Sequence, residues 1–359
     1  MIRDVEGASP ASLAGFDEII DVRSPAEFAE DHVPGAVNMP VLTDAQRAEV
    51  GTIYVQQSKF LAKRIGAALV ARNIADHLEG PLRDRPGSYA PLVYCWRGGQ
   101  RSNAMATVLS QVGWRVGLLR GGYRTYRRRV TAELYDSEAP LDLVVLGGGT
   151  GTGKTAVLAR LAGLGVQVLD LEALAAHRGS LFGDLPGTPQ PSQKMFESRL
   201  LAALDGFDPG RPAVVEAESS RIGELRVPPR VWRAMSLAPE VEITAPIEAR
   251  ARHVAAEYGA VLEDPAVVAA LLARLPRHHS GELRALWLKM ALAGDAKGLA
   301  RALIEAHYDP SYHRSSTAIA RVRLGTVDLD ALDADGQVRA AEAIARLVSD
   351  RPQPRTISA

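Results

Sequence analysis

A glycine-rich stretch in the middle of the chain constrains the fold more than any other feature. Its residues match the pattern G-x-x-x-x-G-K-[ST] and are Gly148, Gly149, Thr150, Gly151, Thr152, Gly153, Lys154 and Thr155. The apolar run Leu141–Leu146 precedes the stretch, and a helical pattern of apolar residues follows it. A strand, a glycine loop and a helix in this order form a phosphate-binding loop at one edge of a parallel sheet. The stretch therefore predicts an α/β domain around it.

The same loop predicts how a phosphate group would be held. Its glycines let backbone N–H groups converge on phosphate oxygens, and the N-terminus of the following helix adds positive potential. Lys154 would reach the terminal phosphates, and Thr155 is a candidate Mg²⁺ ligand; no other metal ligand is firmly predicted. This pattern indicates phosphate binding but does not say which phosphate.

Acidic residues at the ends of neighbouring strands are candidates to organise a metal beside the phosphates. Asp170 follows the predicted strand Val166–Leu169, and Glu216 and Glu218 follow Ala213–Val215. Neither position shows the run of four apolar residues before an aspartate that is usual in nucleotide hydrolases. Capping of the next helix is therefore an equally open interpretation for these carboxylates.

The remaining sequence alternates strands and helices before it turns helical. Strands are predicted at Glu18–Val22 and Leu92–Tyr94, and helices at Phe60–Leu78 and Ser102–Val112. Beyond about residue 247 the pattern is helical. We predict an α/β fold with an N-terminal parallel-sheet domain, a phosphate-loop α/β domain and a helical C-terminal region packed on that second domain. The expected bounds are residues 1–132, 138–247 and 248–350.

The chain has a single cysteine, Cys95, which stands between the predicted strand Leu92–Tyr94 and the following helix. Loop N–H groups, the helix N-terminus and the guanidinium groups of Arg97 and Arg101 would stabilise a thiolate, a persulfide or a perselenide. The alternative is a buried, inert cysteine, but glycines and arginines rather than aliphatic residues follow Cys95. A lone cysteine excludes an intrachain disulfide, and no signal peptide is recognised, so we expect a cytoplasmic protein.

Two further polar clusters are candidates for substrate contacts. His177, Arg178 and Ser180 lie among glycines and would form a loop over the phosphate site; a plain surface loop is the alternative. The net charge of the chain is zero, so composition alone does not indicate a nucleic-acid partner.

A local arginine cluster between residues 120 and 129 nevertheless suggests contacts with RNA. Arg124, Arg127 and Arg128 would grip phosphates, and Tyr123 and Tyr126 would stack on bases. A solvated helix face explains the same cluster equally well. A second basic stretch, residues 277–279, is another candidate for RNA contacts.

Three segments of the N-terminal half together resemble the signatures of a rhodanese domain. They are Asp21–Phe28, which reads DVRSPAEF, His32–Asn38, which reads HVPGAVN, and the cysteine loop. Rhodaneses carry sulfur on such a cysteine. In many single-domain members the loop is C-x₄-R, whereas here it is Cys95-x₅-Arg101, one residue longer. Longer loops of this fold resemble those of phosphatases, so this loop is sized for more than one sulfur atom.

The combination with the second domain resembles the bacterial tRNA 2-selenouridine synthase family. The likeness runs from about residue 15 to Tyr312 and includes DLEALAAHRGSLFG from Asp170, QPSQKMFE from Gln190, ESSRIG after Ala217 and YDPSY from Tyr308. It implies a rhodanese-like domain fused to a P-loop NTPase-like domain. It also implies substrate or supporting roles for residues on the second domain: Asp170, His177, Arg178, Ser180, Glu216, Glu218 and Arg221.

The resemblance also implies a reaction. Members of that family replace the sulfur of 2-thiouridine at the tRNA wobble position with selenium from selenophosphate, through an S-geranyl intermediate made from geranyl diphosphate. Lys154 would then serve geranyl transfer, and Cys95 with Arg97 and Arg101 would serve selenation. The expected partners are the lysine, glutamate and glutamine tRNAs and an enzyme that supplies selenophosphate, with no membrane. An apolar pocket for the geranyl tail is expected in the second domain.

Other classes of protein stay open at this point. A P-loop kinase or ATPase with a regulatory rhodanese module would explain Lys154 and Thr155 equally well. A phosphatase on the rhodanese fold is suggested by the spacing from Cys95 to Arg101 alone. A third alternative is a sulfur carrier or an RNA-binding adaptor without enzymatic activity.

Overall fold

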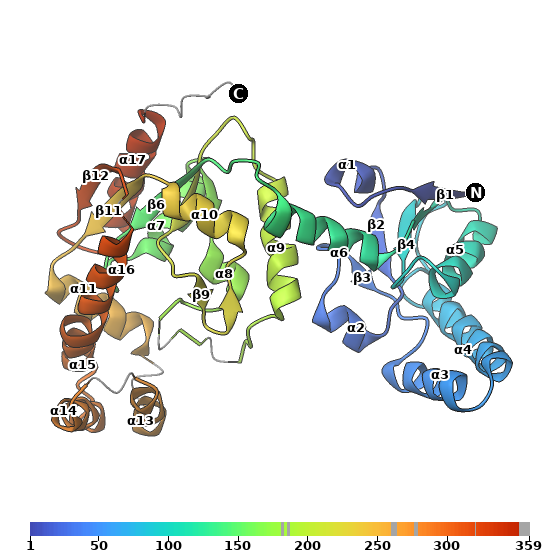
Figure 1. Ribbon diagram of the computed structural model, residues 1–359, viewed down its shortest axis with the longest axis horizontal. Helices are drawn as coiled ribbons and strands as arrows, with labels where there is room; N and C mark the ends of the chain where they lie inside the picture. Colours follow the sequence, from blue (N-terminus) through green and yellow to red (C-terminus); the bar gives the residue numbers. More distant parts are fainter. Residues whose placement is uncertain (181–182, 185–186, 260–263, 276–278, 320, 352–359) are drawn as a thin grey trace. The chain divides into compact units, whose positions relative to one another are not determined.

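The protein forms two compact units, which are described separately below. The computed structural model describes residues 1–180, 183–184, 187–259, 264–275, 279–319 and 321–351. The first unit contains Met1–Ser137 and Pro191–Asp205, and the second contains Glu138–Gln190 and Gly206–Ala359. The predicted α/β fold with parallel sheets is confirmed for both units (Figure 1). In the described part of the chain, no helix has both the length and the apolar character needed to cross a membrane.

The first unit is built on a five-stranded parallel sheet in the order β1-β5-β4-β2-β3. The central strand β4 is buried along its whole length, because its apolar side chains face the sheet's two covering layers. The strands are β1 Ile2–Val5, β2 Glu18–Asp21, β3 Val37–Asn38, β4 Pro91–Tyr94 and β5 Val116–Leu119. The predicted strands at Glu18 and Leu92 are therefore confirmed, and β1, β3 and β5 were not predicted.

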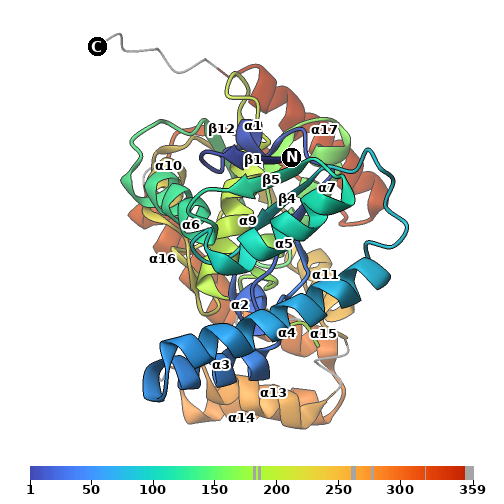
Figure 2. The same ribbon diagram turned by 90° about the vertical axis from the view of Figure 1, so that its right-hand side faces the viewer.

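Helices cover this sheet, and their N-termini follow ordinary capping rules. Ser24 and Glu27 form a capping box at the start of α2, and Ser58 accepts the N–H of Leu61 at the start of α4. Helices α3 and α4 pack side by side, as Figure 2 shows. The helices are α1 Pro10–Leu13, α2 Pro25–Glu30, α3 Asp44–Gln56, α4 Lys59–Glu79, α5 Gln100–Val112 and α6 Tyr123–Thr131, with a π-helical turn at Ala132–Asp136.

One helix of the first unit comes from a distant part of the sequence. Helix α9, Gln193–Asp205, packs against α6. The carboxylate of Glu197 is buried there, where it accepts hydrogen bonds from Arg127 and from the Tyr135 hydroxyl, the latter at 2.6 Å. A buried carboxylate is costly unless it is paired, and this pair anchors α9 in place. The chain therefore leaves the second unit after Gln190 and returns to it at Gly206.

The second unit has its own five-stranded parallel sheet in the order β12-β11-β6-β8-β7. Its strands are β6 Leu143–Gly147, β7 Gln167–Leu169, β8 Ala213–Glu216, β11 Glu240–Thr244 and β12 Arg323–Asp328, and a small hairpin joins β9 Arg221–Ile222 to β10 Leu225–Arg226. The region beyond residue 247 is thus helical except for β12, which pairs with β11 at the edge of the sheet. The residues of β12 are half-buried or exposed and do not form a buried apolar run, so the sequence pattern did not predict this edge strand.

Helices on both faces and a helical C-terminal part complete the second unit. Helix α17 packs on α7 through Ala340, Ala341 and Ile344, which are fully buried. Trp287, also fully buried, lies in the core formed by the later helices. The helices are α7 Lys154–Gly163, α8 Leu171–Ala175, α10 Pro229–Leu237, α11 Ile247–Glu257, α13 Pro265–Ala273, α14 Gly281–Leu292, α15 Ala296–Leu303, α16 Asp309–Ala318 and α17 Ala334–Ser349, with a π-helical turn at Ile304–Tyr308.

Candidate functional site

The lone thiol lies at the carboxyl end of the central strand of the first unit. Cys95 follows β4 directly, and a short loop leads from it into α5. The Sγ atom accepts the backbone N–H of Gly99 at 3.3 Å and lies 3.1 Å from the hydroxyl of Ser102. Cys95 is only 3% exposed. The sulfur atom therefore has two polar partners, although the Cys95 side chain also belongs to a hydrophobic core cluster with Val22 and Val93. The assignment of Cys95 as a reactive thiol stays a prediction.

Backbone hydrogen bonds from the start of α6 hold the cysteine loop in place. The backbone N–H of Tyr123 donates to the carbonyl of Cys95 at 2.8 Å, and that of Arg124 donates to Trp96 at 3.2 Å. A Cβ atom at Gly122 would lie 2.1 Å from the Cys95 carbonyl oxygen, and the φ of Gly122 is +59°. Only glycine allows this approach. The Gly-Gly pair before Tyr123 therefore serves the geometry of the thiol loop.

The two arginines expected to clamp an anion at Cys95 have different surroundings. Arg101 donates two hydrogen bonds to the Glu27 carboxylate, at 2.6 and 3.2 Å. Burial opposes ionisation of Glu27, but the Arg101 guanidinium outweighs it and lowers the pKa of Glu27. Arg97 is exposed, and within the described residues its side chain has no hydrogen-bond or ion-pair partner. Of the two arginines, only Arg97 therefore has a guanidinium group free to bind an anion.

The cluster of arginines and tyrosines on α6 has some side chains buried in the protein and others exposed to solvent. Tyr123 and Tyr126 are buried, so they cannot stack on bases as expected from the sequence. Arg127 is engaged by Glu197, whereas Arg124 and Arg128 are exposed.

A cavity of about 450 Å³ lies beside these arginines. It is lined by Trp96, Tyr123, Arg124, Arg127, Arg128, Thr131, Asp136 and Lys194. Trp96, half-buried and next to Cys95 in the chain, is the aromatic side chain on this surface that sequence reasoning missed. Of the basic stretch 277–279, the first two residues lie outside the described part of the chain.

In the second unit, the glycine-rich loop joins β6 to α7, as predicted. The φ angles of Gly148, Gly151 and Gly153 are positive, which favours glycine at these positions. A Cβ atom at Gly151 would lie 2.6 Å from the side chain of Val254. The Thr152 side chain is buried and donates to the carbonyl of Gly149 at 2.9 Å. The loop therefore packs tightly between its own strand and α11.

Two cations fix the shape of the phosphate loop. The Lys154 ammonium group donates to the carbonyl of Gly148 at 2.7 Å. Arg250 donates to the carbonyl of Thr150 at 2.9 Å and forms a two-point ion pair with Asp309. Burial lowers the pKa of Lys154, against the opposing effect of nearby glutamates. Arg250 and Asp309 were not singled out from the sequence.

The loop borders a cavity of about 740 Å³ that gathers many of the predicted residues. Of the phosphate loop it exposes Gly148, Thr150, Gly151, Gly153, Lys154 and Thr155; Glu172, Arg178, Ser180 and Glu218 line it from other elements. Arg178 lies with its guanidinium carbon 4.9 Å from the centre of the Tyr258 ring, and the Ser180 hydroxyl lies 3.2 Å from that of Tyr258. The glycine-rich segment after α8 therefore forms one wall of the cavity.

Three tyrosines of the helical part complete this cavity and were missed as site residues. They are Tyr258, Tyr308 and Tyr312. The hydroxyl of Tyr312 accepts the backbone N–H of Gly148 at 2.7 Å, so it reaches the phosphate loop itself. The motif from Tyr308 to Tyr312 was visible in the sequence, but nothing local indicated that it folds back more than 150 residues onto the loop.

Two carboxylates, those of Glu172 and Glu218, line the same cavity, and Glu216 lies behind Glu172 without lining it. The Thr155 hydroxyl donates to Glu172 at 3.1 Å, and the backbone N–H of Glu172 donates to Glu216 at 2.8 Å. Burial raises the pKa values of Glu172 and Glu216. Burial, followed by the charge of Glu172, raises the pKa of Glu218 to about 8. Asp170 instead caps α8, because its carboxylate accepts the N–H of Ala173 at 2.8 Å.

The raised pKa of Glu218 predicts a pH-dependent stability. Because the folded protein holds this proton up to a pH of about 8 and the unfolded chain releases it near its ordinary value, the free energy of unfolding should fall as pH rises between these two values. Glu218→Gln should reduce this slope by on the order of 3 kcal/mol between pH 5 and 8, and leave the part that comes from Glu172 and Glu216. Urea unfolding of the wild type, Glu218→Gln and the exposed control Glu224→Gln at three pH values measures it. An unchanged slope in Glu218→Gln would contradict the protonated state.

Besides Asp170 and Glu216, two further predicted site residues do not line the cavity, His177 and Arg221. His177 is buried, with Nδ1 accepting the N–H of Gly179 at 3.0 Å and Nε2 lying 3.5 Å from Asp184. Burial lowers the pKa of this imidazole. Arg221 is exposed on the small hairpin, where it bonds the carbonyl of Gly223 and the carboxylate of Glu224. We therefore regard His177 as support for the loop, and Arg221 as lying outside this cavity.

Comparison with known proteins agrees with both halves of this description. Residues 141–273 match the family model of the tRNA 2-selenouridine synthase AAA domain, and residues 9–129 match that of the rhodanese-like domain. The chain belongs to the tRNA 2-selenouridine synthase family. It is 35% identical over 243 residues to the synthase of Psychromonas ingrahamii, and 38% identical over 246 residues to that of Aeromonas salmonicida. Each alignment covers 67% of this chain and 64% of the relative, so the chain matches just under two thirds of these relatives' length.

The family matches contain both candidate centres. The thiol loop lies within the rhodanese-like match, and the phosphate loop with Glu172 and Glu218 lies within the AAA match. Helix α9 also lies within the AAA match, although it belongs to the first compact unit. Tyr308 and Tyr312 lie beyond residue 273, where the AAA match ends.

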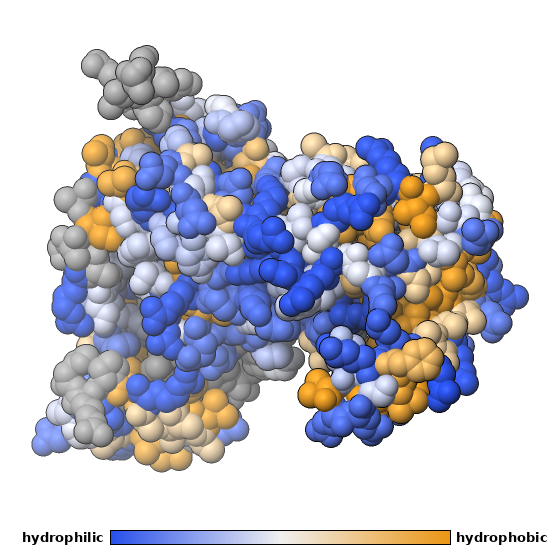
Figure 3. Space-filling view, turned by 45° about the vertical axis from the view of Figure 1, so that its right-hand side comes forward, coloured by the Kyte–Doolittle hydropathy of each residue, from blue (hydrophilic) through white to orange (hydrophobic). Residues whose placement is uncertain are grey.

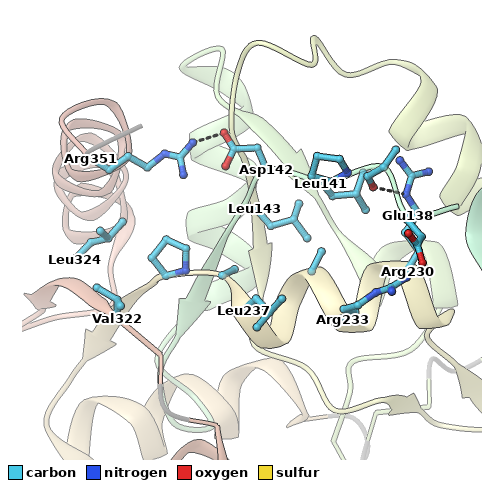
Figure 4. A pocket seen from close by; sticks show the side chains of 15 residues that line it. Glu138, Leu141, Asp142, Leu143, Arg230, Arg233, Leu237, Val322, Leu324 and Arg351 are labelled. Carbon is cyan, nitrogen blue, oxygen red and sulfur yellow. Dashed lines mark hydrogen bonds and ion pairs between the residues drawn. The ribbon is translucent and has the colours of Figure 1, made fainter. Parts of the chain in front are cut away.

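A second cavity of the second unit lies at the opposite ends of the strands. It measures about 720 Å³ and is lined by residues that precede or begin β6, β11 and β12 (Figure 4). Arg351 pairs with Asp142 across it, and Arg230 donates to the carbonyl of Ala139 at 3.1 Å. Because the phosphate loop follows the carboxyl end of β6, this cavity is not part of the family's candidate centre.

Proposed function

We propose that this protein is a tRNA 2-selenouridine synthase, which replaces the sulfur of wobble 2-thiouridine with selenium in two steps. The observation that carries the proposal is that one chain holds a glycine-rich loop with Lys154, in a domain matched by this family's AAA model, and a cysteine loop with Cys95, in a domain matched by the rhodanese-like model. The substrates would be geranyl diphosphate, selenophosphate and tRNAs for lysine, glutamate and glutamine. Because tRNA is the substrate, we expect activity in the cytoplasm.

The first step would be geranyl transfer at the phosphate loop. The sulfur of 2-thiouridine attacks C1 of geranyl diphosphate, the carbon–oxygen bond breaks, and diphosphate leaves with the bonding electrons while the base loses its N3 proton. Lys154 and the N–H groups of the loop would stabilise the charge that develops on the departing diphosphate. The cavity of about 740 Å³ beside the loop is of a size that accommodates such a ligand.

Mg²⁺ is compatible with this cavity. The Thr155 hydroxyl and the Glu172 carboxylate lie 3.1 Å apart, and oxygen donors of this kind suit Mg²⁺. These two residues would hold the ion, which would neutralise diphosphate charge. Across the described residues, no group of three or more His, Cys, Asp or Glu side chains is arranged to hold a metal by itself.

The second step would be selenation at the thiol loop. Selenium of selenophosphate attacks C2 of the S-geranyl base, the carbon–sulfur bond breaks, and geranyl thiolate leaves and takes up a proton. Water then cleaves the selenium–phosphorus bond and releases phosphate. Cys95 would hold or position the selenium, supported by the N–H of Gly99. Arg97, which has no partner within the described residues, would meet the phosphoryl charge. An enzyme that makes selenophosphate is the expected supplier.

The RNA would approach the thiol over the outward face of α6. Arg124 and Arg128 are exposed there, and Trp96 offers an aromatic face next to Cys95. Cations that grip phosphates around an aromatic platform are typical of surfaces that bind single-stranded RNA. Arg127 contributes less, because Glu197 already engages it.

The rival functions find less support in the geometry. In a phosphatase, the arginine that ends the cysteine loop would bind phosphate, but Arg101 is engaged by Glu27. In a kinase or ATPase, the acid that ends the strand beside the phosphate loop would face the bound phosphates, but Glu216 is buried and does not line the cavity. We therefore propose neither.

Mass spectrometry of nucleosides tests the proposed function. An anticodon stem-loop with 2-thiouridine is incubated with geranyl diphosphate and then with selenophosphate. We expect S-geranyl-2-thiouridine after the first incubation and 2-selenouridine after the second. Unmodified nucleoside in both would contradict the proposal, and turnover of ATP without RNA would favour the kinase or ATPase reading.

A further inference from the structure

A large apolar cavity of the first unit takes no part in either candidate centre. It is a groove of about 1020 Å³ between α3, α4 and α5, and hydrophobic side chains gather on this face of the unit (Figure 3). Leu42, Val50, Tyr54, Val55, Ala62, Ala67, Val70, Ala71, Ile74, Ala104 and Val108 line it. Tyr54 and Val55 leave 45% and 82% of their surface exposed. An exposed apolar hollow of this size marks a binding site rather than ordinary surface.

Small residues create the groove. Gly66 of α4 lets α3 pack closely on it, because a Cβ at Gly66 would lie 3.3 Å from Val50. The alanines at positions 67 and 71 of α4 and 104 of α5 then leave space between α4 and α5. Because this space comes from backbone positions and short side chains, it needs no rearrangement of a flexible segment to open.

The groove and the thiol share the first turn of α5. Ser102 lies 3.1 Å from Cys95 Sγ, while its neighbours Gln100, Arg101 and Asn103 line the groove. One end of the apolar surface is therefore only a helical turn from the sulfur atom. Cys95 and Ser102 do not line the groove themselves, so a ligand that reacts at Cys95 would pass its apolar tail over the first turn of α5 to reach it.

The charges around the groove indicate what kind of ligand carries that tail. The charged residues that line it are Arg47, Lys63 and Arg101, and no acidic residue lines it. Because Arg101 is already paired with Glu27, Arg47 and Lys63 supply the positive charge. An apolar floor with a cationic rim suits an apolar chain attached to an anionic molecule, such as RNA. In the second unit, the apolar recess beside the phosphate loop holds only about 20 Å³.

We propose that this groove is the binding site for the isoprenoid chain of the substrate, and holds the geranyl group while the S-geranyl uridine is at Cys95. The inference rests on the proposed function, and it assigns the apolar pocket for the selenation step to the first unit rather than to the second domain, where it was expected. It also gives the selenation step a basis for selecting alkylated over unalkylated RNA, since binding grows with the apolar area buried.

Binding to the full chain tests the groove without any chemistry. Fluorescence anisotropy is measured with stem-loops that carry S-geranyl or S-methyl 2-thiouridine. The wild type should bind the S-geranyl RNA about 100-fold more tightly, because the methyl group leaves the groove empty. Ala71→Trp, which fills the groove, should lose at least about 10-fold of this preference, and Ala68→Trp, on the same helix but outside the groove, should keep it.

A second variant and a second measurement separate an effect on the groove from misfolding of the protein. Thr107→Lys places a charge in the groove from an exposed position of α5, and should also lower the preference for S-geranyl RNA. Both variants should still geranylate thiolated RNA at the wild-type rate. Equal affinity of the wild type for the two RNAs, or a full preference in both groove variants, would overturn the inference. So would a dimer in sedimentation that Ala71→Trp dissociates, which would make a second copy the occupant.

These outcomes are distinct from failure of the proposed function. If the wild type forms neither modified nucleoside, the proposed function fails whatever the binding result. If it forms both, yet the groove variants bind and selenate S-geranyl RNA normally, the groove assignment alone fails.

Discussion

Replacing Cys95 with alanine is expected to lower selenation of S-geranyl RNA by about 1,000-fold or more, while geranylation of thiolated RNA continues at the wild-type rate. The reason is positional. Cys95 is held by the N–H of Gly99 and the hydroxyl of Ser102 in the first unit, whereas the phosphate loop belongs to the second unit. Nucleoside mass spectrometry with each step started separately measures both rates.

The control for this variant is Cys95→Ser, which keeps the volume and the hydrogen bonds of the side chain. If the sulfur atom itself is needed, serine should be as inactive as alanine in selenation, with an unchanged melting temperature. Normal selenation by either variant would contradict a role for the thiol. Loss of both steps together would contradict the division of labour between the two loops.

Sequence reasoning predicted the parts of the site that local pattern determines. A strand followed by glycines and a lysine, or by a cysteine and arginines, specifies a strand-to-helix turn, and both turns form where they were expected. The helix bounds agree closely, as for α4, which runs from Lys59 to Glu79 where a helix was predicted over Phe60–Leu78. These features depend on residues that are close in the chain.

The missed features depend on contacts between distant residues. Glu197 pairs with Arg127 only because α9 leaves the second unit, and no pattern within α9 signals this. Likewise, the Tyr312 hydroxyl accepts a hydrogen bond from the N–H of Gly148, and the Glu27 carboxylate accepts one from Arg101. The expected anion clamp at Cys95 and the expected stacking of Tyr123 were read from spacing, which does not show whether a side chain already has a partner.

Replacing Lys154 with alanine should have the opposite effect to Cys95→Ala: geranylation should fall by about 1,000-fold or more, and selenation of RNA that is already geranylated should continue. A buried ammonium group next to the phosphate loop costs desolvation, which lowers its pKa, and a bound diphosphate would supply the compensating charge. Binding of inorganic diphosphate, measured by calorimetry, should weaken by about 10-fold or more. Lys289→Ala, on the exposed face of α14, is the matched control.

Lys154 also donates to the carbonyl of Gly148, so a control must separate the loss of its charge from collapse of the loop. Lys154→Arg keeps the charge and should recover part of the diphosphate affinity, which a collapsed loop would not do. Mixing Cys95→Ala with Lys154→Ala then separates the two centres. If each variant lacks one step only, the mixture should convert 2-thiouridine to 2-selenouridine, since the geranylated RNA can pass between molecules. Normal geranylation by Lys154→Ala alone would remove the phosphate loop from the reaction.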